Sequence, residues 1–351
     1  MNKRISVIIP NYNGALTIGK CLESVFSPGH DSFEVIVVDD CSDDNSAEII
    51  KNFPCRLIRL NKHSGASRAR NTGVQNSDGE ILFFIDADCI LQKDTLFQVN
   101  KAFMEYLDKK DMLPSPPHPP LGKGGHRGVV IGGTYTRVPY DDTFFSTFQS
   151  IFVNYSETKK KEPDYIATHA MVIDPILFKN SGGFSEDFLP IIEDVEFSHR
   201  LRKSGARLII NPEILVRHIF NFTLWKSLKN AFRKSKYWTI YSLKNRDLFK
   251  DSGTASIELK TNVVSFFLMS SLALFFLSFN HIAFLISIFL IFILNIYINR
   301  NFLAAFYETK GISFTILATF FYAMIYPLAV GAGSFTGMLK YYLTSKHKKV
   351  F

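Results

Sequence analysis

The stretch Phe83-Phe84-Ile85-Asp86-Ala87-Asp88 decides the fold of this 351-residue chain. The apolar run from Ile81 to Ile85 predicts a buried strand, and two carboxylates separated by one small residue follow it. In open α/β sheets, ligands bind outside the carboxyl ends of the strands. Paired carboxylates at such a position can hold a hard divalent cation that bridges phosphate oxygens. Taken alone, the stretch fits two solvated turn aspartates equally well, so the rest of the chain has to decide.

Strand and helix patterns alternate on both sides of this stretch. The expected strands cover residues 5–9, 33–38, 55–60 and 80–85, and the expected helices cover 16–26, 47–53, 67–75 and 94–107. Strand character returns at 129–135, 170–173 and 207–210, and a helix over 193–203 ends at Gly205. The alternation predicts an α/β fold with a mostly parallel sheet covered by helices.

Two of these strands end in acidic pairs, Asp39-Asp40 and Asp86/Asp88. Basic side chains gather around the start of the helix at 67–75, namely Lys62, Arg68 and Arg70. Helix amino-termini and guanidinium groups favour phosphate. The combination predicts a nucleoside diphosphate site, with one acidic pair for the base and ribose and the other for a metal.

Two further residues are candidates for chemistry. Asp194 lies near the amino-terminus of the helix at 193–203, where the helix dipole favours an ionised carboxylate, as a general base requires at neutral pH. A helix-capping acid fits the same position. His218 ends the expected domain, where a metal or phosphate ligand and a structural histidine fit equally.

Other nucleotide-binding folds fit less well. The first strand is not followed by G-x-G-x-x-G, and the chain has no G-x-x-x-x-G-K-[ST], which disfavours dinucleotide oxidoreductases and P-loop enzymes. The prolines and glycines of residues 114–128 predict an inserted flexible loop without chemistry. The four cysteines lack paired metal-ligand spacing, so reduced packing roles are expected.

Two long stretches without Asp, Glu, Lys or Arg, 261–299 and 312–339, predict membrane segments. The first is nearly twice the roughly 20 residues of one crossing, so two helices, about 262–279 and 282–299, are expected with a turn near Asn280. The second, about 312–333, is interrupted by Pro327, Gly331 and Gly333. A third crossing would place the basic carboxyl-terminal segment outside, against the charge rule, whereas a re-entrant or interfacial segment would keep it inside. A buried helical hairpin in a soluble protein is the alternative.

The segment before these stretches predicts a membrane-surface helix. The net charge is +8, and basic residues crowd 226–250. Over 222–243, apolar residues share one helical face, and Trp225, Trp238 and Tyr241 suit the headgroup level. A basic helix packed on a soluble domain is the alternative. The expected organisation is a catalytic domain at 1–218, an amphipathic interfacial region at 219–260 and a membrane domain at 261–351. Membrane lipids, not nucleic acid, are the expected partners of the basic surface.

Residues 5–218 resemble the inverting, nucleotide-sugar-dependent glycosyltransferases of family two, which have the GT-A fold. The stretches that carry the resemblance occur in the family's order: Val7-Ile8-Ile9-Pro10-Asn11-Tyr12-Asn13, Val37-Val38-Asp39-Asp40-Cys41-Ser42, Gly65-Ala66-Ser67-Arg68-Ala69-Arg70-Asn71, Asp86-Ala87-Asp88, Gly182-Gly183-Phe184 and Glu193-Asp194-Val195-Glu196. The loop at 114–128 has no counterpart in the family pattern.

The resemblance implies roles for individual residues. Asp88 would hold Mg²⁺ or Mn²⁺ against the diphosphate, and Asp194 would be the general base. His218, a candidate from its residue type and not from the resemblance, is a further possible metal ligand. By the resemblance, Pro10 and Asp39 or Asp40 would line the nucleobase and ribose pocket, and Asp86 would support Asp88. Together with the basic residues argued above, the full set of candidate nucleotide-sugar-binding residues is Pro10, Asn11, Tyr12, Asp39, Asp40, Lys62, Arg68, Arg70 and Asp86.

The sequence therefore predicts a metal-dependent inverting glycosyltransferase in the inner membrane, multi-pass, with its catalytic domain in the cytoplasm, since no secretory signal is visible. The expected donor is a UDP- or GDP-linked sugar, and the expected acceptor is a hydroxyl of a cell-envelope or lipid-linked glycan. Transfer to a polyprenyl phosphate is the nearest alternative, and such an acceptor would need less help from Asp194. A non-catalytic nucleotide-sugar sensor or membrane scaffold is the alternative from another class. A nucleotidyltransferase fits less well, because the first strand lacks a glycine-rich phosphate loop.

Overall fold

The protein is described by a computed structural model that covers residues 3–27, 32–109 and 128–347. The chain forms two compact units, Met1–Asp141 with Glu157–Phe220, and Asp142–Ser156 with Asn221–Phe351. We call them the sheet unit and the helical unit. Of the proline- and glycine-rich loop predicted at 114–128, residues 114–127 lie outside the described part.

The sheet unit is built on a mixed sheet of eight strands among the described residues, in the order β3-β2-β1-β4-β7-β6-β8-β5. The strands are β1 (Ile5–Asn11), β2 (Phe33–Asp39), β3 (Arg56–Arg59), β4 (Ile81–Phe84), β5 (Cys89–Leu91), β6 (Val129–Tyr135), β7 (Met171–Ile173) and β8 (Arg207–His218). β5 and β7 run against the other strands. The predicted α/β fold with a mostly parallel sheet is confirmed.

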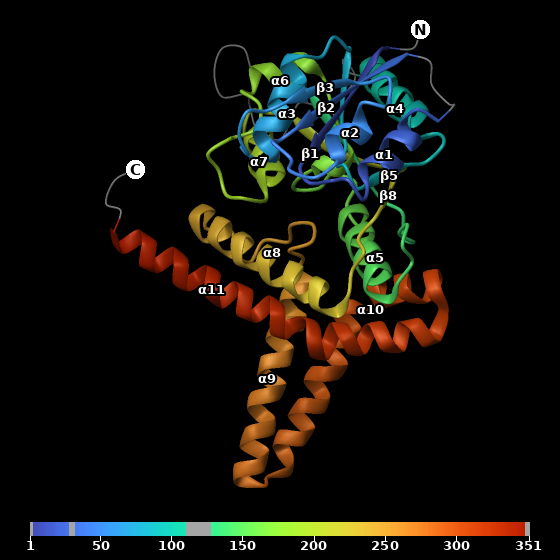
Figure 1. Cartoon of the computed structure of the whole chain (residues 1–351). Coiled ribbons are helices and arrows are strands. Elements are labelled where there is room, and N and C mark those ends of the chain that lie inside the picture. Colours follow the sequence, from blue (N-terminus) through green and yellow to red (C-terminus); the bar gives the residue numbers. More distant parts are fainter. Residues whose placement is uncertain (1–2, 28–31, 110–127, 348–351) are drawn as a thin grey trace. The chain divides into compact units, whose positions relative to one another are not determined.

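Helices cover both faces of this sheet (Figure 1). They are α1 (Ile18–Val25), α2 (Ser46–Ile50), α3 (Ala66–Gln75), α4 (Thr95–Lys109), α6 (Pro175–Asn180) and α7 (Glu193–Lys203), with a 3₁₀ turn, η2, at Thr168–Ala170. On one face, side chains of α3, α6 and α7 pack with Ile8, Leu82 and Phe84 in one apolar core. Burying each such side chain contributes about 1.5–3 kcal/mol, which fixes the strand ends that carry the site.

The edge next to β5 has an irregular register. Gly132 pairs with Ile210, but Thr134 pairs with Leu215, so β8 carries extra residues that bulge out of the ladder. Pro212 lies in the bulge and has no N–H to donate to a neighbouring strand. A Cβ at Gly133 would lie 2.3 Å from the carbonyl oxygen of Ile214, so only glycine fits there. The bulge lets the end of β8 pair with β5.

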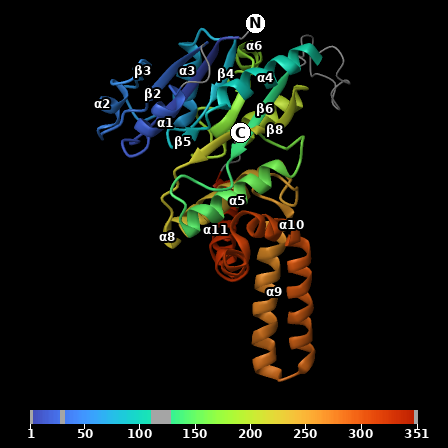
Figure 2. The same cartoon turned by 90° about the vertical axis from the view of Figure 1, so that its right-hand side faces the viewer.

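The helical unit contains a long helical hairpin. Its helices are α5 (Phe144–Thr158, whose last residues belong to the sheet unit), α8 (Leu224–Asn245), α9 (Ile257–Phe279), α10 (Ile282–Phe320), a π-helical turn η3 (Phe321–Ile325) and α11 (Tyr326–His347). α9 and the first part of α10 run antiparallel (Figure 2), and the turn at Asn280 has a left-handed backbone, as expected. α9 and the apolar helical stretch Ile282–Leu343 are each long and apolar enough to cross a membrane.

The third expected membrane segment, 312–333, does not run beside the hairpin. α10 breaks at Gly311, where φ is +72°, and the chain then turns away from the hairpin (Figure 1). From there it continues through η3 into α11, which packs along α8. Gly311 permits this break because a left-handed φ carries no steric penalty for glycine.

A buried polar network joins the hairpin to η3. Asn262 donates to the backbone oxygen of Tyr322 at 2.7 Å, and Asn295 donates to Asn262 at 2.9 Å. Asn299 donates to Asn295 at 2.9 Å and accepts from the Tyr322 hydroxyl at 3.1 Å. A π-helical turn leaves backbone groups outside the regular ladder, and here an asparagine satisfies one of them.

Candidate active site

The candidate site lies at the carboxyl ends of neighbouring strands. β1 lies between β2 and β4, and all three are parallel, so Asn11, Asp39 and the Asp86–Asp88 turn emerge at the same edge. In the register, Asn11 pairs with Asp39 and Pro10 pairs with Val38. This is where the sequence predicts the nucleotide site.

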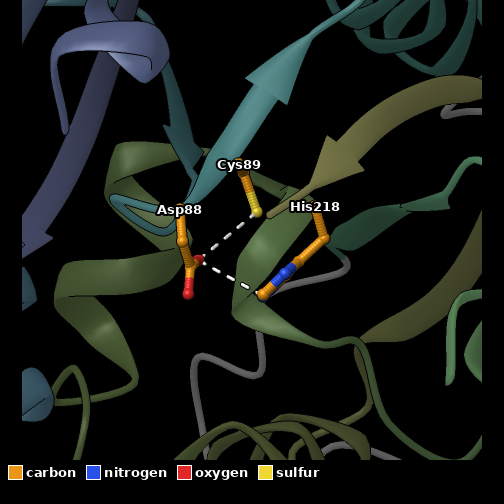
Figure 3. A group of neighbouring side chains, drawn as sticks. All are labelled: Asp88, Cys89 and His218. Carbon is orange, nitrogen blue, oxygen red and sulfur yellow. Dashed lines mark hydrogen bonds and ion pairs between the residues drawn. The ribbon is translucent and has the colours of Figure 1, made fainter. Parts of the chain in front are cut away.

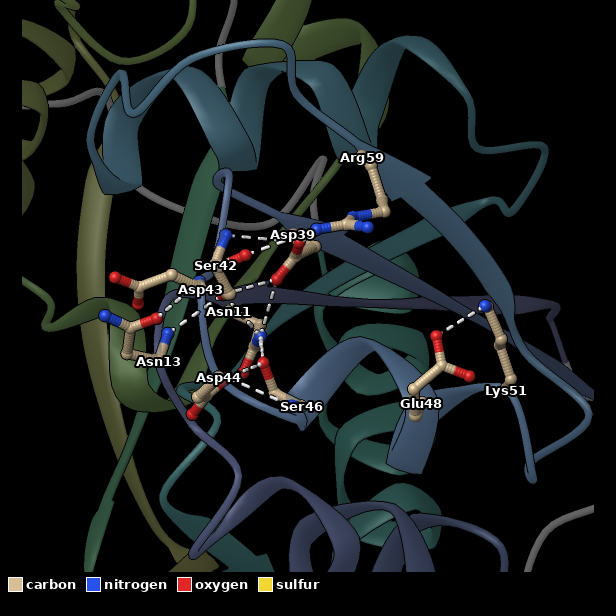
Figure 4. Close-up of polar contacts among 10 residues, drawn as sticks. All are labelled: Asn11, Asn13, Asp39, Ser42, Asp43, Asp44, Ser46, Glu48, Lys51 and Arg59. Carbon is tan, nitrogen blue, oxygen red and sulfur yellow. Dashed lines mark hydrogen bonds and ion pairs between the residues drawn. The ribbon is translucent and has the colours of Figure 1, made fainter.

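Asn11 and Asp39 form a buried polar network (Figure 4). Asn11 Nδ2 donates to Asp39 Oδ1 at 2.8 Å and to the Ser46 hydroxyl at 2.9 Å. Asp39 also accepts from the Ser42 hydroxyl at 2.5 Å and from Arg59 Nε at 3.1 Å. Asn11 Oδ1 is buried and accepts no hydrogen bond from any described residue. The network fixes the loop after β2 and leaves one buried acceptor at the strand end.

Asp40 organises the other side of this loop. Its oxygens accept from the backbone N–H groups of Ser64 and Gly65, both at 2.7 Å, and lie 2.8 Å from His63 Nδ1. The His63 ring stacks on the half-exposed ring of Tyr12, with centroids 4.0 Å apart. The pair offers a flat aromatic surface of the kind on which a nucleobase stacks. Next to it, Lys62, His63 and Arg68 line a cavity of about 600 Å³.

Arg70 ties three parts of the site together. Its guanidinium is buried and donates to Asp86 Oδ1 and to Glu193 Oε1, both at 2.7 Å, so α3, the turn after β4 and the start of α7 meet there. Burial opposes ionisation of Asp86, but Arg70 prevails and lowers its pKa. Arg68, which lines the cavity, pairs with Glu186 at 2.9 Å. Arg68 and Arg70 were both predicted to contact phosphate, and in this structure both form ion pairs with carboxylates.

Asp88 and His218 meet although they lie 130 positions apart in the chain (Figure 3). Cys89 pairs with His218 in the β5–β8 ladder, and Ile219 N donates to Asp88 O at 2.8 Å. Asp88 Oδ1 lies 3.3 Å from His218 Nε2. The ligand atoms of Asp88, Cys89 and His218 all lie within 4.8 Å of one another.

The Asp88 carboxylate fits Mg²⁺ or Mn²⁺, because both cations prefer oxygen ligands. The imidazole of His218 is a ligand type more common for softer divalent metals and would be the secondary ligand here. Burial raises the pKa of the Cys89 thiol well above its usual range, and the negative charges of Asp88 and Asp86 add to the shift. Cys89 is therefore a protonated packing residue in the metal-free protein, and a thiolate is a soft ligand that Mg²⁺ and Mn²⁺ do not prefer, which leaves Asp88 and His218 as the two candidate ligands.

The first turn of α7 carries three acids, Glu193, Asp194 and Glu196, after a left-handed residue, Ile192. Glu193 binds Arg70, and Glu196 accepts from Arg200 at 3.1 Å. Asp194 accepts from the backbone N–H of Val195 at 2.8 Å. Arginine side chains thus hold both glutamates, Arg70 at Glu193 and Arg200 at Glu196.

His169 belongs to the same charged cluster and was not predicted. It is buried on η2, its ring stacks on Tyr135 at 3.9 Å between centroids, and its Nε2 lies 3.3 Å from Glu157 Oε2. Burial lowers its pKa, but the carboxylates of Glu157, Asp86 and Asp194 outweigh burial and raise it. Its neighbours in sequence, Thr168 and Ala170, form no motif, so only the fold reveals it.

Comparison with known proteins identifies one domain of the chain. The sequence model for "Glycosyl transferase family 2" matches residues 6–118, which include Asn11, Asp39, Arg70 and the Asp86–Asp88 turn. Residues 6–118 are a glycosyl transferase family 2 domain. The resemblance drawn from the motifs is confirmed.

Relatives of the family 2 domain include glycosyltransferase GlyA of Streptococcus pneumoniae, 30% identical over 165 residues that cover 46% of this chain and 23% of GlyA. The putative teichuronic acid biosynthesis glycosyltransferase TuaG of Bacillus subtilis is 33% identical over 106 residues, 29% of this chain and 42% of TuaG. The chain thus spans less than half the length of these curated relatives.

A solved structure confirms the fold around the family 2 domain. The mannosyltransferase PcManGT from Pyrobaculum calidifontis, solved in complex with GDP-Man and Mn²⁺, superposes with a TM-score of 0.55 at 17% identity. The match covers 98% of this chain and 88% of that chain. The predicted GT-A fold followed by carboxyl-terminal helices is therefore confirmed.

Proposed function

We propose that the protein is an inverting glycosyltransferase, which moves a sugar from a UDP- or GDP-linked donor to a hydroxyl of a cell-envelope or lipid-linked glycan acceptor at the cytoplasmic face of the inner membrane. The observation that carries the proposal is the contact of Asp88 with His218 in the same site as α7, whose first turn carries Asp194, at the strand edge that holds Asn11 and Asp39. Family 2 membership supports the reaction class.

The nucleoside end of the donor would lie over the loop after β2. Tyr12 and His63 supply an aromatic surface, and Asn11 Oδ1 supplies a buried acceptor for a donor group of the ligand. Asp39 and Asp40 are nearly saturated by protein donors, so we assign them chiefly to holding this loop in place. Lys62 lines the adjoining cavity, where its charge suits phosphate.

Asp88 and His218 would hold Mg²⁺ or Mn²⁺, with Asp86 fixed behind them by Arg70. When bound, the metal would offset the negative charge that builds on the departing nucleoside diphosphate. The structure of PcManGT with GDP-Man and Mn²⁺ supports a divalent metal in this fold.

Asp194 would take the proton of the acceptor hydroxyl. An alcohol is a poor nucleophile until its proton leaves, and a positioned carboxylate typically contributes about 10²–10⁴-fold by accepting it in the transition state. The amino-terminus of α7 favours the ionised carboxylate. Attack on the anomeric carbon from the side opposite the diphosphate breaks the sugar–phosphate bond and inverts the configuration.

We propose that the helical unit attaches the enzyme to the membrane. The α9–α10 hairpin exposes many apolar side chains, as lipid contact requires. α8 carries an exposed tryptophan, Trp225, whose accessible fraction is 76%, and a basic face, which suits the headgroup level. Because 312–333 turns away from the hairpin at Gly311, we favour an interfacial third segment over a third crossing.

Turnover of the purified full chain against a panel of nucleotide sugars, with a membrane lipid extract as acceptor source, tests the proposal. The expected result is sugar transfer from one UDP- or GDP-linked donor to a glycan hydroxyl, with inverted configuration. If the sugar is instead transferred to a polyprenyl phosphate, the enzyme is a polyprenyl-phosphate glycosyltransferase, and the proposed hydroxyl acceptor is wrong. Nucleotide-sugar binding without transfer to any acceptor would support a sensor and contradict the enzyme.

A further inference from the structure

A largely apolar groove lies within the helical unit, lined by α5, α8, α9, α11 and the segment before α9. Its volume is about 220 Å³, and its apolar lining includes Phe152, Trp238, Val263, Val264, Tyr326 and Val330. An engineered cavity of about 150 Å³ with an apolar lining stays dry and binds benzene. The groove therefore has room for part of a hydrocarbon chain, and water would not fill its apolar end.

One buried polar atom in this lining has no protein partner. Gln149 is 2% exposed, and its Oε1 accepts no hydrogen bond from any residue that the structure describes. Leaving a buried acceptor unsatisfied costs free energy, so such atoms in native proteins usually meet a ligand or a water. Gln149 thus calls for a hydrogen-bond donor inside an otherwise apolar groove.

Two lysines are among the residues that line the groove. Lys234 of α8 and Lys260 of α9 both line it, and Lys260 also donates to the backbone oxygen of Lys250. Lys260 is the last charged residue before the uncharged stretch 261–299, which marks the level of the lipid headgroups. Val264 lies one turn further along the same face of α9, toward the hydrocarbon.

We infer that the groove binds one anionic phospholipid of the surrounding bilayer, such as phosphatidylglycerol. Its acyl chain would lie along the apolar lining, its phosphate would meet Lys234 and Lys260, and a headgroup hydroxyl would donate to Gln149 Oε1. The match of charge is the argument for this occupant, since an anionic phospholipid carries a phosphate next to its acyl chains and a neutral lipid has no net negative charge to meet the lysines. The inference rests on the proposed membrane attachment but not on the transfer reaction.

Native mass spectrometry of the delipidated full chain in detergent, titrated with phosphatidylglycerol or phosphatidylcholine, tests the site. Lys234→Gln removes a headgroup contact, and Val264→Trp fills the groove from a position that is 57% exposed and so leaves the packing intact. Lys229→Gln is the matched control, because Lys229 is an exposed α8 lysine that does not line the groove.

We expect one phosphatidylglycerol to bind more tightly than phosphatidylcholine. Lys234→Gln should weaken it about five-fold, Val264→Trp should remove it, and Lys229→Gln should leave it unchanged. Equal binding of both lipids, or equal effects of the two lysine variants, would overturn the inference, as would displacement of phosphatidylglycerol by stoichiometric polyprenyl phosphate, which would make the groove an acceptor site. Liposome co-sedimentation of the wild type distinguishes failure of the lipid site from failure of the proposed membrane attachment. A protein that does not partition to liposomes would reject membrane attachment itself.

Discussion

Replacing Arg70 by methionine should destabilise the sheet unit while preserving the shape of α3. The Arg70 side chain is 4% exposed and neutralises two carboxylates, Asp86 and Glu193, whose side chains are 33% and 14% exposed. Removing one partner of a buried ion pair costs about 3–5 kcal/mol, because the remaining charges stay buried without compensation. The partial exposure of Asp86 places the expected loss near the lower end, about 3 kcal/mol.

The expected change in melting temperature follows from the size of the unit. In a domain of roughly 200 residues, 1 kcal/mol shifts the melting temperature by about 2–4 °C, so Arg70→Met should lower it by about 6–12 °C. Differential scanning calorimetry of the full chain in detergent measures the shift. Arg68→Met is the matched control on the same helix. Arg68 is 50% exposed and pairs with Glu186, so its loss should cost at most about 1 kcal/mol.

Equal shifts in the two variants would refute the reasoning. So would an Arg70→Met protein that melts like the wild type but no longer binds nucleotide sugar, because that result would return Arg70 to the phosphate contact predicted from sequence. The account instead expects donor affinity and turnover to fall together with stability, since Arg70 positions both Asp86 and the start of α7.

Three further predictions concern the metal, the membrane network and pH. Asp88→Asn should lower turnover by more than about 100-fold, to the level of chelator-treated wild type, and activity that survives both treatments would reject the metal assignment. Asn262→Leu removes two buried hydrogen bonds and should cost about 0.6–1.7 kcal/mol, measured as a lower melting temperature in detergent; an unchanged value would show that the network adds no stability. The pKa of His169 in the folded protein is raised above 6.5. The protonated ring therefore contributes its full stabilisation of the folded state below about pH 6.5, and this contribution is lost as the pH rises through the folded pKa. As the pH increases through this range, the melting temperature should therefore fall more steeply in the wild type than in Glu157→Gln. Equal slopes in the two proteins would contradict the inference that Glu157 stabilises protonated His169.

The parallel half of the sheet could be predicted from sequence because its signals are local. Short β-branched and aromatic runs end in polar turns at Asn11, Asp39 and Asp86, and parallel strands must present those ends at one edge. The Asp88–His218 contact was predicted only as a possibility. It depends on β5, a strand of three residues that no periodicity reveals, and on the bulge in β8.

The remaining features of the site and of the fold could not be predicted, because they depend on contacts between segments that are distant in sequence. The position of Arg70 at a helix start predicts a phosphate ligand. In the structure its guanidinium binds Glu193, which lies 123 positions away in the chain, so the sequence around Arg70 does not reveal this partner. His63 and His169 carry no motif. α5 was not predicted either: most of it belongs to the helical unit although the flanking chain belongs to the sheet unit, and sequence order alone cannot show such an excursion.

The central claim, that Asp194 activates an acceptor hydroxyl beside a nucleotide-sugar site, is tested most directly by one paired measurement on Asp194→Asn. Calorimetric binding of the nucleotide sugar and turnover with the hydroxyl acceptor are measured in the same preparation of the full chain. We expect donor affinity close to that of the wild type and turnover reduced by about 10²–10⁴-fold, because the amide keeps the shape of the carboxylate but cannot accept the proton. Near-normal transfer would contradict the claim and favour a phosphate acceptor, and loss of donor binding would make Asp194 a structural residue.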